Sequence, residues 1–147
     1  MKIIICLDNH NGYMFNNRRL SSDKCITDDI EKFVKTNRVI VTPYSHKLFS
    51  ERSNVIVNND PFAVASNNDY WFVEDSDINK CLSKVTEIIM FKWNRDYPYD
   101  KTLSMNMDNW KLVSHADFAG NSHEKISKDV FLRKDEWVCI RKFYRYY

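Results

Sequence analysis

Two adjacent arginines stand just before the start of a predicted helix. They belong to a polar segment composed of Asn16, Asn17, Arg18, Arg19, Leu20, Ser21, Ser22 and Asp23. A guanidinium group binds a carboxylate or a phosphate through paired hydrogen bonds, and the free amides of a helix N-terminus attract the same anions. We therefore expect an anion-binding or partner-binding site at Asn16, Asn17, Arg18 and Arg19. The alternative is a solvated loop in which a serine only caps the helix.

A second segment mixes positive charge, an amide and aromatic rings after a predicted strand. It consists of Lys92, Trp93, Asn94, Arg95, Asp96, Tyr97, Pro98 and Tyr99. Tryptophan, tyrosine and arginine are the side chains that most often anchor protein interfaces, and aromatic rings also stack on bases. We expect Trp93, Asn94, Arg95 and Tyr97 to contact a macromolecular partner. Otherwise these rings cover the edge of the sheet.

Two histidines with neighbouring carboxylates form a third candidate site. His115 and Asp117 would share one face of a strand, and His123 precedes Glu124. Such groups can bind a metal ion or act as acid and base, but their spacing matches no diagnostic ligand pattern. A polar turn is the expected structure here, and we expect neither a metal nor a cofactor in this protein.

The last residues, from Arg133 to Tyr147, interleave basic and aromatic side chains. Alternating arginine, lysine and tyrosine can follow a phosphate backbone and stack on bases. The same segment can instead form a last strand in which Trp137, Cys139 and Phe143 pack inward. The first alternative predicts a single-stranded nucleic acid as a partner, whereas the second predicts a structural role.

The composition limits the classes of protein to which this chain can belong. The chain has 147 residues, two glycines and a net charge of +2. Two glycines exclude a glycine-rich phosphate loop and a dinucleotide-binding fingerprint, and the small charge gives no independent argument for nucleic acid binding. No apolar run reaches the roughly 18 residues of a membrane span, and no signal peptide is recognisable. The cysteines form no Cys-x-x-Cys pair, so we expect a cytoplasmic protein with buried thiols.

Apolar runs alternate with helical patterns over the first part of the chain. Strands are predicted at 3–7, 39–41, 55–57, 70–73 and 88–91. A helix is predicted from a serine cap at Ser21 or Ser22 to Asn37, shorter helices at 44–49 and 75–85, a helical turn from 60–61, and a loop over 8–20. This alternation predicts a single α/β domain with a mostly parallel sheet and helices on both faces. Patterns near 110–113, 129–132 and 137–140 predict antiparallel edge strands at the C-terminal end.

The order of these elements resembles that of dihydrofolate reductase over most of residues 1–133. The resemblance rests on the opening strand, Gly12, an asparagine at 16 or 17, Asp23, Arg38–Val41, Tyr44–Lys47, Asn54–Asn58, Thr86–Phe91, Asp108–Val113 and Asn121–His123. It implies a reductase-like fold with residues 134–147 as an extension. It also implies a cleft in which Asp23 is the acid and Arg18, Arg19 or His123 lies near the substrate.

The chain departs from reductases at positions that carry their chemistry. Reductases have two glycines after the fifth strand, where backbone amides approach the cofactor pyrophosphate, and this chain has Lys92, Trp93 and Asn94 there. The Pro-Trp pair of the substrate loop is replaced by Arg18 and Arg19. The resemblance therefore implies the scaffold and not an active NADPH-dependent reductase.

Three segments also resemble a family of small proteins from gut Firmicutes and their mobile elements. These segments are Phe15–Arg19, Lys92–Pro98 and Gly120–Ile126. Members of that family often carry the name ribonuclease Z, which implies a zinc site with the pattern His-x-His-x-Asp-His. The four histidines, His10, His46, His115 and His123, never approach this spacing, so we reject a zinc ribonuclease.

These observations lead to one expected function and two alternatives. We expect a non-catalytic accessory or inhibitory protein of the mobile-element or phage type, which binds a protein partner such as a host defence protein. Its contacts are expected at Arg18, Arg19, Trp93, Arg95 and Tyr97. The first alternative is an enzyme that binds a nucleotide or a pterin-like molecule, with Asp23 and His123 as its catalytic candidates. The second is a protein that binds single-stranded nucleic acid.

Overall fold

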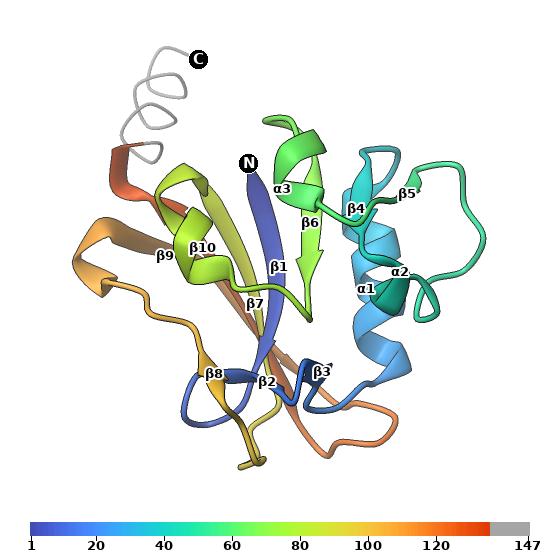
Figure 1. Cartoon of the computed structure of the whole chain (residues 1–147). Helices are drawn as coiled ribbons and strands as arrows, with labels where there is room; N and C mark the ends of the chain where they lie inside the picture. Colours follow the sequence, from blue (N-terminus) through green and yellow to red (C-terminus); the bar gives the residue numbers. More distant parts are fainter. Residues whose placement is uncertain (136–147) are drawn as a thin grey trace, which may run out of the picture.

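A computed structural model describes residues 1–135 of the chain. Among them, seven strands form one sheet in the order β5-β4-β6-β1-β7-β10-β9 (Figure 1). The five parallel strands are β1 (Lys2–Leu7), β4 (Val39–Val41), β5 (Val55–Val57), β6 (Tyr70–Val73) and β7 (Glu87–Lys92). Strands β10 (Ile126–Arg133) and β9 (Trp110–Phe118) follow β7 in antiparallel pairs. The predicted fold class is confirmed, and the strand predicted at 137–140 lies outside the described residues.

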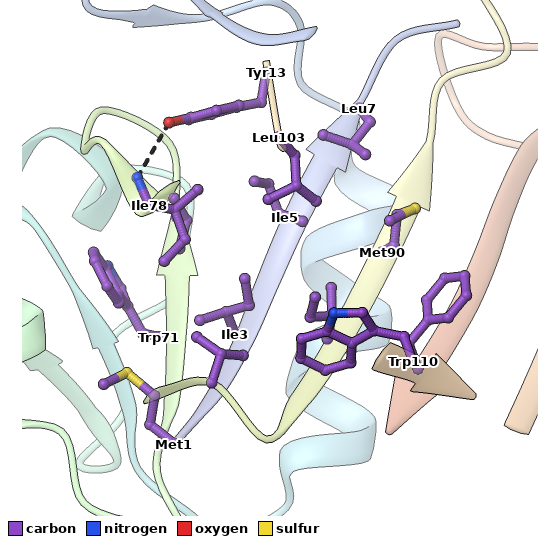
Figure 2. Packing of buried hydrophobic residues seen from close by; sticks show 14 of the residues in the cluster. Met1, Ile3, Ile5, Leu7, Tyr13, Trp71, Ile78, Met90, Leu103 and Trp110 are labelled. Carbon is purple, nitrogen blue, oxygen red and sulfur yellow. Dashed lines mark hydrogen bonds between the residues drawn. The ribbon is translucent and has the colours of Figure 1, made fainter. Parts of the chain in front are cut away.

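The central strands are buried on both faces, which explains their unbroken apolar sequences. Along β1, Ile3, Ile5 and Leu7 belong to the cluster drawn in Figure 2. Ile4 belongs to a second cluster on the opposite face. Because consecutive residues of a strand point to opposite faces, one short strand contributes to both halves of the core.

Helix α1 (Lys24–Val34) covers the second face and lies behind β1 in Figure 2. Ile26, Ile30 and Val34 recur at four-residue spacing, and all three are buried. This spacing places them on one side of the helix, which is therefore the side that packs on the sheet.

The ends of α1 differ from the sequence-based expectation. Asp23 caps the helix, in place of Ser21 or Ser22, and its side chain accepts a hydrogen bond from the amide of Cys25. At the other end, Lys35 adopts a φ of 54° and stops the helix two residues before Asn37. An aspartate is as good an N-cap as a serine, and here it also has partners elsewhere in the fold.

The remaining helical segments are short. Helices α2 (Pro43–His46) and α3 (Pro61–Val64) begin after the capping side chains of Thr42 and Asp60, so the predicted helical turn at Asp60 is confirmed. The helix predicted at 75–85 is a 3-10 helix, η1 (Ile78–Lys84), and a further 3-10 turn, η2 (Met107–Asn109), precedes β9. No helix within residues 1–135 is long and apolar enough to cross a membrane.

A second, three-stranded sheet forms beside the first, where a loop was predicted over 8–20. Its order is β3-β2-β8, with β2 (Gly12–Phe15), β3 (Arg18–Arg19) and β8 (Lys101–Thr102). The prediction was wrong because β2 has only four residues and β3 only two, too few for an alternating pattern to show. Tyr13 anchors the sheet to the core, since its hydroxyl accepts a hydrogen bond from the amide of Ile78 (Figure 2).

The two glycines give space rather than backbone freedom. The positive φ values in the described part belong to other residues, namely Asn11, Asn16, Asn17, Lys35 and Asn94, and asparagine tolerates this conformation. Gly120 is instead needed because there is no room for a side chain. A Cβ at this position would lie 2.5 Å from Oδ2 of Asp23 and 2.8 Å from Cδ1 of Ile126. The absence of a side chain therefore lets the turn at 120–123 close over the Asp23 carboxylate.

Candidate functional site

A cavity of about 320 Å³ opens between the start of α1 and the carboxyl ends of the central parallel strands. Its lining residues are Cys6, Ser21, Ser22, Asp23, Lys24, Ile26, Thr27, Lys47, Leu48, Phe72, Glu74 and Trp93. Cys6 comes from β1, Phe72 from β6, and Trp93 directly follows β7. Open α/β sheets bind their ligands at this end of the strands, and the volume is in the range of small-molecule sites.

Asp23 is held by hydrogen bonds on both carboxylate oxygens. Oδ1 accepts from the amides of Cys25 at 2.9 Å and Asn121 at 3.0 Å. Oδ2 accepts from the amide and hydroxyl of Ser122 and lies 3.0 Å from Nδ1 of His123. Burial raises the pKa of this carboxyl, but these hydrogen bonds outweigh burial and hold the pKa well below its ordinary value. Asp23 therefore stays ionised and does not fit the role of a proton-donating acid.

His123 is enclosed on every side by defined partners. Its side chain is 2% exposed. Because Asp23 is ionised, Nδ1 is the nitrogen that donates to it, and Nε2 faces the hydroxyls of Ser21 at 3.1 Å and Tyr97 at 2.8 Å. The ring stacks on Trp93 with 4.5 Å between centroids. The structure thus joins Asp23 and His123, two catalytic candidates that lie 100 positions apart in the sequence.

The side chains of the two neighbouring arginines make different contacts. Arg19 turns inward, donates from Nε and from a terminal nitrogen to Glu74 at 2.8 and 3.0 Å, and lies over the ring of Tyr44. Arg18 is exposed and, in the neighbouring position of β3, lines a depression that is also lined by Phe15, Asn16, Arg19, Leu20 and Pro98. The predicted bidentate anion site is therefore occupied, on the Arg19 side, by a carboxylate of the protein itself.

Glu74 and Cys6 line the cavity, but neither side chain is available as a nucleophile. Burial raises the pKa of Glu74, and the ion pair with Arg19 offsets part of that rise. Burial, with a contribution from Glu74, also raises the pKa of the Cys6 thiol well above its ordinary value. A protonated thiol is a poor nucleophile, so Cys6 acts as an apolar wall of the cavity.

Most of the predicted site residues after β7 have partners inside the molecule. Trp93 is 3% exposed, Asn94 donates to the carbonyl of Lys125 and the hydroxyl of Ser127, and the amide of Tyr97 donates to Asp8. The exposed Arg95 has one contact, at 3.4 Å, to the carbonyl of Ser122. Contact with a partner through Trp93 would require this packing to open, whereas the alternative of rings that cover the sheet fits the structure.

Comparison with known proteins identifies the fold but no family. No family model matches the chain, and no curated protein matches it. A solved structure of dihydrofolate reductase from Enterococcus faecalis, complexed with NADP(H) and RAB-propyl, superposes with a TM-score of 0.63. The match covers 90% of this chain and 95% of that one, at 7% sequence identity. The chain has a dihydrofolate reductase-like fold.

On this reductase-like fold, the second histidine lies apart from the cavity. His115 on β9 contacts the carboxylates of Asp129 and Asp117, with its Nε2 3.3 Å from the latter. Asp129 first and then Asp117 raise the pKa of this exposed imidazole. The structure therefore separates the two histidines of the predicted third site: His123 contacts Asp23, whereas His115 lies on the outer strand β9. Residues 1–135 contain no group of three or more metal-ligating side chains that could hold a metal ion.

Several residues of the cavity could not be assigned from the sequence. Cys6 and Phe72 lie in apolar runs that indicate only buried strands, and Glu74 is one acidic residue among several after β6. A signal did exist for Glu74, because a charged residue that directly follows a buried parallel strand lies at the end of the sheet where ligands bind.

Proposed function

We propose that this protein binds a small organic anion in the cavity beside α1. The observation that supports this is the combination of an apolar interior with one exposed lysine at the edge. Ile26, Leu48 and Phe72 line the cavity together with the Trp93 ring, while Lys47 is an exposed cation at its edge. Apolar walls with a few fixed polar groups are typical of small-molecule sites.

The contacts of the cavity narrow the class of ligand. Asp23 has no free acceptor that a pterin-like ring could use, because its oxygens already receive hydrogen bonds from the protein. The Glu74 carboxylate is neutralised by Arg19. Lys24 pairs with Asp28, whereas Lys47 has no ion pair with another residue in the described part of the chain. We therefore infer a ligand with an aromatic or branched apolar body and a carboxylate or phosphate that faces Lys47.

A binding screen with a blocked variant tests the proposal. Aromatic carboxylates and phosphate monoesters are expected to raise the melting temperature of the wild-type protein and to change the fluorescence of Trp93. The variant Thr27→Trp fills the cavity and removes this response, and Lys47→Glu weakens it at least about tenfold by reversing the charge at the rim. The control Lys111→Glu, on the exposed face of β9, leaves the response unchanged. A screen in which no compound binds, or in which Thr27→Trp binds equally well, contradicts the proposal.

A protein partner is a second candidate function, for which the exposed surface of the small sheet provides support. Phe15 is 40% exposed and Tyr99 is 38% exposed, and Arg18 lies in the same depression as Phe15 and Pro98. Aromatic rings beside an arginine are typical interface anchors. Under this proposal the protein is a cytoplasmic accessory or inhibitory factor of a mobile element or phage, its partner is a host protein such as a defence protein, and Arg18 and Arg95 make contacts.

This second candidate makes a separate prediction. Arg18→Glu is expected to abolish binding of a purified partner at an unchanged melting temperature, and Arg52→Glu, an exposed arginine elsewhere, is expected to have no effect. Retention of binding in Arg18→Glu removes this assignment. The nucleic acid alternative rests on the segment after Arg133, most of which lies outside the described residues, and a gel shift with single strands at low salt tests it.

A further inference from the structure

A serine and an aspartate of the cavity wall, Ser21 and Asp23, are joined by hydrogen bonds through the buried histidine His123. The hydroxyl of Ser21 lies 3.1 Å from Nε2 of His123, and Nδ1 of the same ring lies 3.0 Å from Oδ2 of Asp23. We propose that Ser21 is a nucleophile activated by His123, and that the protein hydrolyses small esters of aromatic or branched carboxylic acids. This inference rests on the proposed ligand site, because it places the reaction in the same cavity.

The histidine is oriented as a general base has to be. Asp23 remains ionised and fixes the proton on Nδ1, so that Nε2 presents its lone pair toward Ser21. The stacked ring of Trp93 prevents the imidazole from turning away. The amides of Asn121 and Ser122 hold the aspartate in place. The pair is therefore organised before any substrate enters, which is the condition for efficient proton transfer.

Ser21 is the hydroxyl that meets both requirements of a nucleophile. It lines the cavity and is partly exposed, so a substrate can reach it. Ser22 also lines the cavity, but its hydroxyl makes no hydrogen bond with the histidine in the described structure. The Cys6 thiol is kept protonated by burial. The first turn of α1 begins three residues later, and the positive end of its dipole favours negative charge that develops near Ser21.

Tyr97 affects how well His123 can accept the proton of Ser21. Its hydroxyl lies 2.8 Å from the same Nε2, closer than the hydroxyl of Ser21. A single lone pair on Nε2 cannot accept fully from both hydroxyls. Tyr97 therefore holds the histidine in position and also competes with Ser21 for the lone pair of Nε2. We treat Tyr97 as a positioning residue, and its removal is expected to increase the reactivity of the serine.

The reaction has two balanced steps. Ser21 Oγ attacks the acyl carbon while its proton passes to Nε2, and that proton then leaves with the alcohol or phenol as the ester bond breaks. A water molecule next gives a proton to Nε2 and attacks the acyl group on Ser21. The proton returns to Ser21 Oγ, and the carboxylic acid is released. The product is an apolar carboxylate, which is the class of ligand that the walls and Lys47 are proposed to hold.

Covalent labelling tests this activity directly. A fluorophosphonate probe forms a stable bond to an activated serine, and peptide mass mapping locates the adduct. We expect the adduct on Ser21 in the wild-type protein and in the control Ser22→Ala, and none in Ser21→Ala or His123→Gln. Hydrolysis of 4-nitrophenyl benzoate is expected to fall at least about a hundredfold in kcat/KM in the last two variants. Tyr97→Phe is expected to raise kcat and to leave KM unchanged, because the lone pair of Nε2 then faces Ser21 alone.

A cysteine variant keeps the test decisive if an alanine variant folds poorly. Ser21→Cys places a thiol beside the histidine, and we expect iodoacetamide to alkylate it at least tenfold faster than the thiol of Ser22→Cys, since a neighbouring base favours the thiolate. Equal alkylation rates, or a wild-type protein that acquires no adduct on Ser21, overturn the catalytic inference. If carboxylates still bind and the blocked Thr27→Trp variant still loses that binding, the ligand site stands while the hydrolase inference fails. If Ser21 acquires no adduct and no carboxylate binds, both the hydrolase inference and the proposed ligand site are refuted.

Discussion

Two of the histidines that face aspartates, His123 and His115, lie in opposite surroundings. His123 and Asp23 are buried, with side-chain exposures of 2% and 0%. His115 is 51% exposed and lies between Asp129 and Asp117 on the outer strands. In the first pair every polar atom is fixed by a neighbour and the ring stacks on Trp93. In the second pair the imidazole is half exposed, so solvent screens its charge even though Asp129 is buried. The same two residue types thus produce a rigid site at one place and a surface ion pair at the other.

Removing Asp23 should have the largest effect in this comparison. Asp23→Ala takes away the cap of α1 and leaves His123 buried without its carboxylate. We expect a loss of about 3 to 5 kcal/mol in the free energy of unfolding, measured by urea denaturation, because the Nδ1–H of His123 and the amides of Asn121 and Ser122 lose their acceptor and α1 loses its cap. Asp28→Ala removes an exposed aspartate of the same helix and should change stability little. Equal losses of unfolding free energy in the two variants would show that the buried hydrogen bonds of Asp23 do not stabilise the protein more than an exposed ion pair does.

A methyl group at position 120 tests how tightly the site is closed. In Gly120→Ala the new Cβ would lie 2.5 Å from Oδ2 of Asp23, so either the turn or the carboxylate has to move. The expected destabilisation is about 1 to 3 kcal/mol, read from the urea midpoint. Ala119→Ser, at the exposed neighbouring position, serves as the control. A fully stable Gly120→Ala protein would mean that the turn does not press on Asp23.

The acid limb of the stability profile reports on Asp23. Its pKa is lowered in the folded protein, so its stabilisation is present above the unfolded value of 3.8 and is lost as the pH falls toward the folded value. We expect the difference in unfolding free energy between the wild type and Asp23→Asn to shrink below about pH 4. A difference that stays constant from neutral pH into acid would contradict the assignment of an ionised, hydrogen-bonded carboxylate.

The alkaline limb should report on His115, with the opposite sign and the smallest effect. Its pKa is raised in the folded protein, so its stabilisation is complete below the unfolded value of 6.5 and is lost as the pH rises through the folded value. His115→Asn should therefore remove a decrease in stability that the wild type shows above pH 6.5. Urea midpoints across this range measure the change, and a wild-type profile identical to that of His115→Asn would refute it.

The sequence predicted the parts of the fold that depend on local pattern. Apolar runs such as Ile3–Leu7 located the buried strands, and Asp60 before Pro61 located a helical turn. The two-residue strands β3 and β8 were missed because pairing with β2 creates them, not their own residues. The resemblance to dihydrofolate reductase predicted the fold correctly.

The site was harder to predict because it is made by distant segments. Asp23 and His123 were each named as candidates, but their contact depends on the turn at Gly120, which no local pattern indicates. Arg18 and Arg19 were grouped because they are adjacent, yet the alternation of β3 sends only Arg19 inward to Glu74. Trp93 was taken for a surface contact, whereas its ring packs on His123.

The most direct test of the account is to locate ligand binding residue by residue. Nitrogen-15 and proton NMR spectra of the labelled protein can be recorded during titration with an aromatic carboxylate. We predict shifts of the Trp93 indole and of the amides of residues 21–27, with no change around His115, and loss of these shifts in Thr27→Trp. Shifts confined to the surface around Phe15 and Arg18, or to β9 and β10, would contradict the central claim that the cavity beside α1 is the functional site.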